Sequence, residues 1–274
     1  MSISVETPGA LADRGPFFQP AWRDENGELN GFRVQGVKYV RMLSFLQQQL
    51  NSYRYLEIGT STGDSLAVMR GRVVCVDPSF GLARNVWAGK EQIHLYQLTS
   101  DDYFAQHDPK PLLGGPVQLA FIDGMHHYEY VLRDFMNLEQ HCAPDTVVVL
   151  HDCIPWKFSL TRRLAVDDKG SFEPVVGAWT GDVWKALLVL SQLRPDLRFS
   201  FLDCPPTGLV AISGLNPSST VLRQNLAAAI TQMDAVPDTA NNFWTWIEQQ
   251  TLVDTQQVVA NPAQLWKVLG LAAR

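Results

Sequence analysis

Residues 55–66, with the sequence YLEIGTSTGDSL, constrain the fold of this chain more than any other stretch. A hydrophobic run that contains Glu57 leads into a turn with two glycines, Gly59 and Gly63, and then into a segment that can start a helix. Glycine leaves the backbone uncovered, so such a turn lets a ligand lie directly against it. Free N–H groups at the start of the helix would point at the same ligand. The pattern predicts a strand, a ligand-binding turn and a helix.

A second acidic residue follows the next hydrophobic run. Residues 72–77, RVVCVD, end at Asp77, and the spacing from Glu57 is 77 − 57 = 20 residues. In nucleotide-binding α/β units, a carboxylate about twenty residues on accepts hydrogen bonds from ribose hydroxyls. The turn reads E-x-G-x-x-x-G and not the G-x-G-x-x-G of dinucleotide sites, which favours a nucleoside ligand without a pyrophosphate.

Strands and helices alternate along most of the chain. Hydrophobic runs predict strands at residues 53–59, 72–77, 94–99, 117–122, 146–150, 197–202 and 208–213. The first five are continuous β-branched runs, which indicate strands buried on both faces of a parallel sheet. Apolar spacing predicts helices at 37–46, 62–70, 82–90, 101–106, 128–141, 182–192, 221–233, 242–250 and 262–271.

The link at residues 205–208 is rich in proline and glycine and too short for a helix, so it predicts a hairpin between the last two strands. The predicted fold is therefore α/β: a Rossmann-like, seven-stranded, mostly parallel sheet with a closing antiparallel hairpin. We expect helices on both faces of this sheet and a helical C-terminal extension.

We expect the chain to divide into three parts. Residues 1–52 would form an N-terminal extension, loose over its first thirty residues, and a lead-in helix; residues 53–215 would form the ligand-binding domain, and residues 216–274 the helical extension. Trp244, Trp246 and Trp266 in the last part could line a substrate wall or form a homodimer contact, although packing is the commoner role of such residues.

Composition excludes several classes of partner. The net charge of −6 argues against nucleic acid, which requires a basic surface. Apolar runs stay well short of the roughly twenty residues that cross a bilayer, and the N-terminus lacks the pattern of a secretory signal. The four cysteines are widely spaced and predict reduced thiols in place of a disulfide frame or a zinc site. These features predict a cytoplasmic protein that acts on a small molecule.

The glycine turn, taken with Asp77, resembles the first motif of the class I S-adenosylmethionine-dependent methyltransferases. The resemblance implies that Glu57 and the backbone of the turn hold the methionine part of S-adenosylmethionine, and that Asp77 holds the ribose. The turn residues concerned are Gly59, Thr60, Ser61 and Gly63. Ser100 and Asp101, after the third strand, stand where this family places polar contacts to adenine.

A more specific motif follows the fourth and fifth strands. It comprises FIDG at residues 121–124, then His127, Tyr128, Glu129 and Asp134, and finally LHD at residues 150–152. It resembles the subfamily of macrocin-type O-methyltransferases and cephalosporin-hydroxylase-like proteins. The resemblance implies O-methylation of a small hydroxylated acceptor, a sugar or a secondary metabolite, with Asp123 beside the methyl donor.

Methyl transfer to oxygen needs an aligned acceptor and a route for its proton. In metal-dependent relatives, one carboxylate after the fourth strand and two oxygen ligands after the fifth hold magnesium, and Asp123 and Asp152 match two of these positions. His151 stands where a carboxylate is usual, which leaves three options: magnesium, a softer ion such as manganese or zinc, or no metal. Without a metal, a histidine would take the proton. We expect His127 first and His151 second, and His126 to be a solvated loop residue.

Three other functions stay open on the sequence alone. They are N-methylation, a cofactor-binding but non-catalytic partner subunit that uses the C-terminal helices as its interface, and a dinucleotide-dependent oxidoreductase. The glycine spacing and the closing hairpin count against the oxidoreductase. The sequence does not identify the acceptor.

Overall fold

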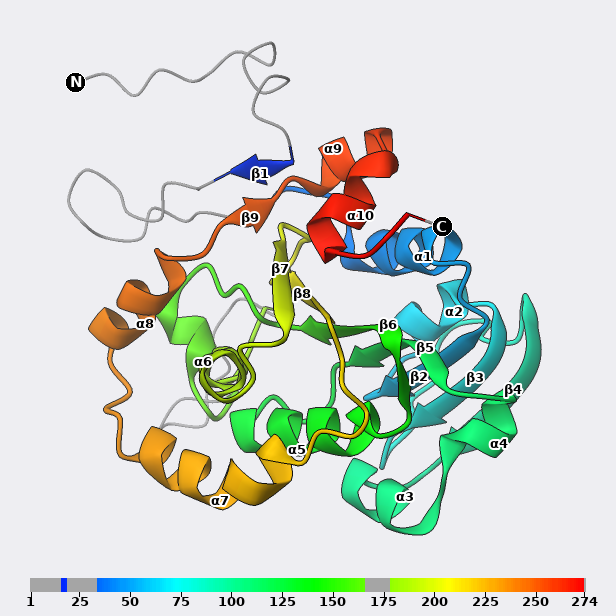
Figure 1. The fold of residues 1–274 in the computed structure, drawn as a ribbon, viewed down its shortest axis with the longest axis horizontal. Helices are drawn as coiled ribbons and strands as arrows, with labels where there is room; N and C mark the ends of the chain where they lie inside the picture. Colours follow the sequence, from blue (N-terminus) through cyan, green and yellow to red (C-terminus); the bar gives the residue numbers. More distant parts are fainter. Residues whose placement is uncertain (1–15, 19–33, 166–177, 274) are drawn as a thin grey trace.

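A computed structural model describes residues 16–18, 34–165 and 178–273 of the chain (Figure 1). The predicted loose segment at residues 1–30 lies almost entirely outside the described residues. A single sheet carries the described strands in the order β1-β9-β7-β8-β6-β5-β2-β3-β4. Five of these strands are mutually parallel: β2 (Arg54–Ile58), β3 (Gly71–Val76), β4 (Lys90–Tyr96), β5 (Val117–Ile122) and β6 (Cys142–His151).

An antiparallel pair extends this parallel core. β8 (Leu209–Ser213) lies between β6 and β7 (Arg198–Leu202) and runs antiparallel to both. The seven predicted strands and their closing hairpin are therefore confirmed. Two short strands beyond β7, β9 (Leu252–Val253) and β1 (Phe17–Phe18), extend the sheet further. A strand of two residues leaves no alternating pattern, which is why the sequence did not predict them.

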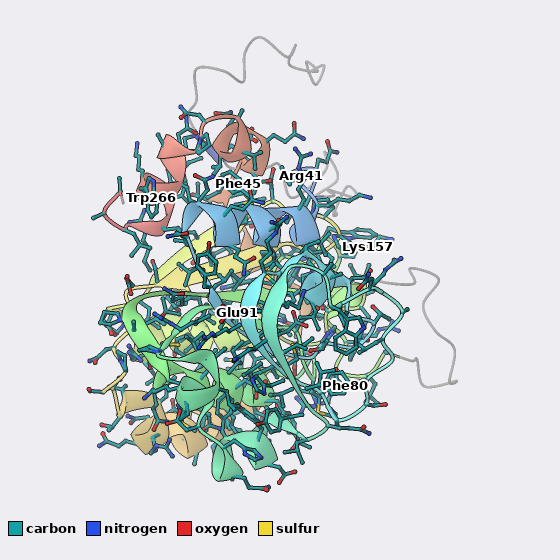
Figure 2. The ribbon with its side chains drawn as sticks, turned by 90° about the vertical axis from the view of Figure 1, so that its right-hand side faces the viewer. Arg41, Phe45, Phe80, Glu91, Lys157 and Trp266 are labelled. Carbon is teal, nitrogen blue, oxygen red and sulfur yellow. The ribbon has the colours of Figure 1, made fainter. Side chains whose placement is uncertain are left out.

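Helices cover both faces of the sheet (Figure 1). One hydrophobic cluster joins the sheet to α1 (Tyr39–Gln49), α2 (Asp64–Val68), α9 (Thr255–Ala260) and α10 (Ala263–Leu269). The other joins it to α3 (Ser100–Gln106), α5 (Tyr128–Glu139), α6 (Trp184–Leu193), α7 (Val221–Asp234) and α8 (Ala240–Ile247), with the short α4 (Pro109–Leu113) at its end. Figure 2 shows α1 crossing above the strands, with Phe45 on it and Trp266 to its side; both side chains pack on the first of these clusters.

Successive residues of a strand face opposite sides of the sheet, and β2 divides the core in this way. Leu56 and Ile58 belong to the cluster on the α5 side, whereas Tyr55 belongs to the cluster on the α1 side. Glu57 has the same parity as Tyr55. The side chain of Glu57, which the sequence predicted to bind the cofactor, therefore lies on the α1 face of the sheet.

Several predicted bounds were wrong. The helix predicted at residues 82–90 is absent, and residues 78–89 form a loop. The reason is that this loop donates its hydrogen bonds elsewhere: the Gly81 amide donates to the Ser61 carbonyl, and the Ala83 amide donates to the Thr62 carbonyl. The strand predicted at 94–99 runs instead from Lys90 to Tyr96. The short helices α4 and α9 were not predicted.

Other predictions hold. All four cysteines are buried and unpaired. Trp246 is buried and its ring lies 5.3 Å from that of Trp184 on α6, so this tryptophan packs within the core. Within the described residues, no helix combines the length and the apolar character that a membrane span requires.

Candidate active site

The register of the central strands places the site. Ile58 of β2 pairs with Ile122 of β5, and Ile122 pairs with Leu150 of β6. Gly59, Asp123 and His151, which follow these three residues, therefore lie in one row at the carboxyl ends of the strands. The chain leaves β2 toward β3 on one side and later returns to β5 on the other. Ligands of open α/β sheets bind where the strand order reverses in this way.

Contacts within the protein leave no room for a side chain at either glycine of the turn. Gly59 has φ +85°, and a Cβ at this position would lie 2.0 Å from the carbonyl oxygen of Asp123. Gly63 has φ +81°, and a Cβ there would lie 2.7 Å from Val86. The sequence analysis attributed both glycines to ligand contact. The structure shows that Gly59 lets β2 and β5 end side by side and that Gly63 seats the 78–89 loop.

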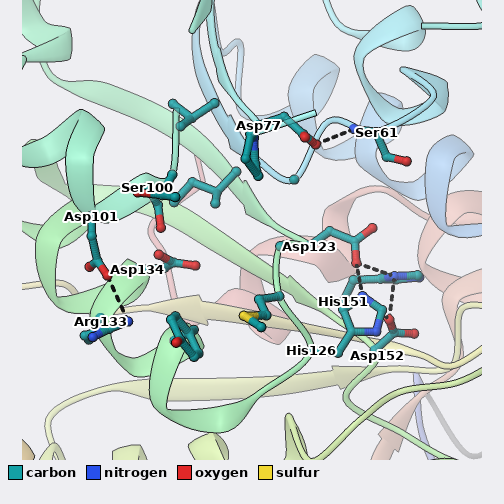
Figure 3. A pocket seen from close by; sticks show the side chains of 18 of the residues that line it. Ser61, Asp77, Ser100, Asp101, Asp123, His126, Arg133, Asp134, His151 and Asp152 are labelled. Carbon is teal, nitrogen blue, oxygen red and sulfur yellow. Dashed lines mark hydrogen bonds and ion pairs between the residues drawn. The ribbon is translucent and has the colours of Figure 1, made fainter. Parts of the chain in front are cut away.

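One cavity of about 870 Å³ runs along this edge of the sheet (Figure 3). Its volume falls in the range of small-molecule sites. Of the predicted cofactor residues, those that line it are Gly59, Ser61, Asp77, Ser100, Asp101 and Asp123. The turn residues Thr60 and Gly63 do not line it, and neither does Glu57.

Glu57 lies beneath the turn. Its side chain has no exposed surface, and its Oε2 accepts a hydrogen bond of 2.6 Å from the Tyr55 hydroxyl. Its Oε1 has no hydrogen-bond partner among the described residues. Burial raises the pKa of Glu57 to about 7, against the opposing hydrogen bond from Tyr55. Glu57 is therefore buried beside Tyr55 and is not exposed to a ligand in the cavity.

Asp77 connects the turn to the cavity. Its Oδ2 accepts a hydrogen bond of 2.7 Å from the Ser61 amide, and its Oδ1 accepts one of 2.7 Å from the Ser79 amide. The side chain is buried but lines the cavity. Asp77 therefore fixes the shape of the turn and keeps a carboxylate edge toward the ligand space.

Two carboxylates and two imidazoles gather at the other end of the cavity (Figure 3). His151 Nδ1 lies 3.0 Å from Asp123 Oδ1, and His126 Nε2 lies 3.1 Å from Asp152 Oδ2. His126 Nε2 also lies 3.5 Å from Asp123 Oδ1. Asp152 has φ +57° and accepts a hydrogen bond from the Thr207 hydroxyl. Asp is among the few residues that tolerate this backbone conformation.

The position of Trp179 sets the protonation of His126. His126 Nδ1 lies 3.2 Å from the Trp179 carbonyl oxygen, and the two rings stack with centroids 4.7 Å apart. A carbonyl can only accept, so Nδ1 carries the proton of this hydrogen bond. The other nitrogen, Nε2, then faces two carboxylate oxygens. A bare lone pair on Nε2 would be repelled by both oxygens. Nε2 must therefore carry a proton or bind a metal ion.

The charges of this cluster stabilise one another. Burial alone would raise the pKa of Asp123, but His151 and His126 outweigh it and lower this pKa to about 2. Burial alone would lower the pKa of His126, but Asp152 and Asp123 outweigh it and raise it. The same balance holds the pKa of His151 well above its usual value.

A divalent cation fits part of this cluster. Asp123, His126 and Asp152 each offer one ligand atom, and these atoms lie within 4.8 Å of one another. Two carboxylates and an imidazole are a common donor set for transition metals. His151, predicted as a ligand, is not in this group: its Nδ1 is taken by Asp123, and its Nε2 is buried without a partner among the described residues.

The structure separates the two neighbouring histidines of the motif. His127 Nε2 lies 3.0 Å from the Arg163 carbonyl oxygen, and His127 does not line the cavity. His126, which the sequence analysis expected in solvent, lines the cavity. Both lie in a loop without periodicity, so no sequence pattern could have shown which of them faces inward.

A mostly apolar wall continues from His126. Met125, Tyr130, Ala165 and Trp179 line the cavity on this side. The Trp179 indole donates a hydrogen bond of 2.7 Å to the Arg162 carbonyl oxygen, which anchors it. This wall leaves room for a second, partly apolar molecule beside the carboxylate and histidine cluster.

Residues 56–153 match the family described as a methyltransferase domain. No curated protein matches the chain. An O-methyltransferase from Bacillus cereus in complex with SAH shares 20% identity, with 63% of this chain and 79% of that chain covered and a TM-score of 0.43.

For the O-methyltransferase TomG from Streptomyces achromogenes in complex with SAM, the identity is 18%, the coverage 65% and 79%, and the TM-score 0.43. A putative caffeoyl-CoA O-methyltransferase from Staphylococcus aureus shares 15% identity, with coverage of 64% and 82% and a TM-score of 0.44.

The matched residues include the glycine turn, Asp77, and the motif residues from Asp123 to Asp152. They also span β3 to β6 and most of β2, the parallel part of the sheet. The match to a methyltransferase domain therefore covers the turn, Asp77 and the cluster at the strand ends.

Proposed function

We propose that this protein transfers the methyl group of S-adenosylmethionine to a hydroxyl oxygen of a small acceptor, such as a sugar or a secondary metabolite. The observation that carries the proposal is the single cavity that joins Asp77 and the glycine turn to the cluster of Asp123, His126 and Asp152. One end of this cavity has groups suited to a nucleoside, and the other end has groups that can accept or donate a proton.

The nucleoside end would hold the cofactor, which supplies an electrophilic methyl group on its sulfonium. Asp77 would accept hydrogen bonds from the ribose hydroxyls. The backbone at Gly59 and Ser61, which lines the cavity, would lie against the methionine part. The 78–89 loop is hydrogen-bonded to the turn and would hold it in this shape.

The proton end would prepare the acceptor. A hydroxyl is a poor nucleophile until its proton leaves, and a nearby divalent cation lowers its pKa. Asp123, His126 and Asp152 would hold that cation, and the imidazole favours manganese or zinc over magnesium. His151 would donate its Nδ1–H to Asp123 and so hold this carboxylate in the orientation that the cation requires.

The same groups also support a metal-free route. His126 Nε2 would first release its own proton to solvent and then accept the hydroxyl proton, and the carboxylates of Asp152 and Asp123 would stabilise the imidazolium that forms. Both routes remove a proton from the acceptor. A hydroxyl needs this step more than an amine does, because a neutral amine is nucleophilic before it loses a proton. This is why we favour O-methylation over N-methylation.

Binding and turnover test the proposal separately. SAH should bind in calorimetry, and NAD should not. With labelled S-adenosylmethionine and a panel of hydroxylated acceptors, Asp123→Asn and His126→Gln should each lower kcat at least 100-fold. His127→Ala is the matched control, because this neighbouring side chain lies outside the cavity, and it should keep wild-type turnover. Binding of NAD without SAH, or full activity in the Asp123 and His126 variants, would contradict the proposal.

A chelator distinguishes the two routes. If the cation route operates, EDTA abolishes turnover, manganese restores it, and Asp152→Asn weakens manganese binding measured by paramagnetic resonance. Unchanged turnover in EDTA would assign the proton to His126 alone.

A further inference from the structure

Asp134 lines the cavity next to Gly124, the residue after Asp123: a Cβ at Gly124 would lie 3.6 Å from Asp134 Oδ2. It is midway along α5, 3% exposed, and lines the cavity with Ser100 and Asp101. Figure 3 shows Ser100, Asp101 and Asp134 grouped together, apart from Asp123 and its partners. Neither the strand tips nor the glycine turn accounts for a buried acid here.

Asp101, the acid predicted to contact adenine, is already paired. Its Oδ2 lies 2.8 Å from Arg133 Nη2, and its side chain is 41% exposed. The Arg133 guanidinium also lies over the Tyr130 ring, 4.3 Å from its centroid. Asp101 is therefore half of an ion pair at the rim. Among the described residues, no cation forms an ion pair with Asp134, although Arg133 is its neighbour in the chain.

The order of the strands sets the direction of the ligand. Asp77 follows β3, and β4 lies beside β3 at the edge of the sheet. Ser100 follows β4 and begins α3, whereas Asp123 and Gly59 lie in the opposite direction. A nucleoside whose ribose contacts Asp77 and whose methionine part lies at Gly59 must therefore direct its base toward Ser100 and Asp134.

We propose that Asp134 is the residue that selects adenine in this cofactor site, pairing through a neutral carboxyl group with the N1 and N6 edge of the base. The inference deepens the proposed function and depends on it. A neutral carboxyl group presents a hydroxyl donor and a carbonyl acceptor side by side. The adenine edge presents the complementary pair, the N1 acceptor and the N6 amino donor.

The surroundings of Asp134 favour this protonation state. Burial raises its pKa to about 7, helped by the charge of Asp101 and opposed by the Ser100 hydroxyl and Arg133. Asp101 on α3 and Arg133 on α5 are the charged groups beside it. An ionised Asp134 could still accept from N6, but it would repel the lone pair on N1. Cofactor binding above neutral pH should therefore take up one proton.

Calorimetry with SAH at about pH 6 and about pH 8.5 tests this. For the wild type we expect the Kd to rise about thirtyfold between the two, because the neutral form is about thirtyfold depleted at pH 8.5 when the pKa is about 7. Asp134→Asn keeps a donor and an acceptor in place, so it should bind SAH with a Kd independent of pH. Asp134→Leu should weaken binding about 100-fold at the lower pH, because the N1 and N6 groups would be left unpaired.

Glu91→Gln is the control, because Glu91 is an exposed acid that pairs with Arg72 outside the cavity, and it should bind SAH with the affinity and pH dependence of the wild type. A second measurement needs no variant: an SAH analogue that lacks the 6-amino group should bind the wild type at least tenfold more weakly than SAH. Equal affinity for the two ligands, or pH dependence that persists in Asp134→Asn, would overturn the assignment of Asp134. Absence of SAH binding by the wild type at both pH values would instead overturn the proposed function.

Discussion

At the scale of single residues, Gly59 ties the cofactor turn to the end of β5. Its φ of +85° and the 2.0 Å that would separate a Cβ from the Asp123 carbonyl oxygen leave no place for a side chain. We expect Gly59→Ala to lower the free energy of unfolding by about 3–5 kcal/mol, because the backbone cannot yield without moving Asp123. Chemical denaturation measures this, and calorimetry should show weaker SAH binding in the same variant.

Gly81→Ala provides the control for Gly59→Ala. A Cβ at Gly81 would meet nothing within 4 Å. This variant should unfold within about 0.5 kcal/mol of the wild type, as surface substitutions generally do. Equal losses in the two variants would show that the contact with Asp123 is not the cause.

Glu57 predicts a dependence of stability on pH. Its pKa is raised in the folded protein from 4.5 to about 7. The folded state therefore holds this proton more tightly than the unfolded state, and stability falls as pH rises from about 4.5 through 7. The difference of 2.5 pKa units corresponds to at most about 3 kcal/mol.

Glu57→Gln removes this titration while keeping the shape of the side chain. Relative to the wild type, the variant should gain up to about 3 kcal/mol in the free energy of unfolding between pH 5 and pH 8, measured by urea denaturation without cofactor. Other buried acids such as Asp134 titrate in both proteins and cancel in the difference. A difference that stays constant over this range would show that Glu57 is ionised throughout.

At the scale of elements, one arginine joins the segment before Leu164 to the start of α5. Arg163 pairs with Glu129, and its Nη1 lies 3.0 Å from Asp182 Oδ2. Asp182 is buried and accepts a hydrogen bond of 3.0 Å from the Tyr128 amide. Trp179, three residues before Asp182, stacks on His126. This contact therefore holds the wall of the acceptor site against the cluster at the strand tips.

In Arg163→Ala, the cation left beside the buried Asp182 is Lys185, whose Nζ lies 3.7 Å from Asp182 Oδ2. Because the arginine is partly exposed, we expect a modest loss of about 1–2 kcal/mol in stability. The effect on the KM of the acceptor should be larger than the effect on SAH affinity. Arg84→Ala, which breaks an exposed pair with Asp64, is the control and should change neither. A change in SAH affinity alone would contradict this role.

The same scale shows where sequence patterns stopped being informative. The seven longer strands and the longer helices α1, α5, α6 and α7 follow from hydrophobic periodicity, and the row of Gly59, Asp123 and His151 follows from a parallel register. The 78–89 loop was mistaken for a helix because its backbone bonds to the turn are long-range contacts that no local pattern encodes. The sequence also favoured His127 over His126 as the histidine of the site for this reason. The contact that holds His126 in the cavity is with the Trp179 carbonyl, which comes from a segment far along the chain.

At the scale of the whole molecule, the last helices complete the core. Leu265, Val268 and Leu269 of α10 have no exposed surface, and the Val268 carbonyl accepts hydrogen bonds from Arg198 and Ser200 of β7. Residues 216–274 were predicted to form a helical extension. In the structure their side chains belong to both hydrophobic clusters of the sheet. The sequence could not predict this packing, because the apolar face of a helix does not indicate which surface it covers.

Removal of residues 252–274 should therefore prevent folding. Each of the three buried side chains contributes about 1.5–3 kcal/mol through burial, and β7 would lose β9, one of its two partner strands. We expect insoluble protein, or soluble protein without a cooperative thermal transition in circular dichroism. Removal of residues 272–274 alone is the control and should leave the transition in place. A cooperative transition in the longer truncation would show that the sheet is stable without α10.

The contact between Gly59 and the Asp123 carbonyl has a consequence for how such an enzyme could acquire new substrates. Because the two strand tips interlock, neither can be remodelled for a different acceptor without loosening the grip on the methyl donor. In the adjoining wall, Trp179 stacks on His126, but the side chains of Met125 and Ala165 have no such role. Engineering of acceptor range should therefore begin with Met125 and Ala165 and leave the interlocked tips untouched.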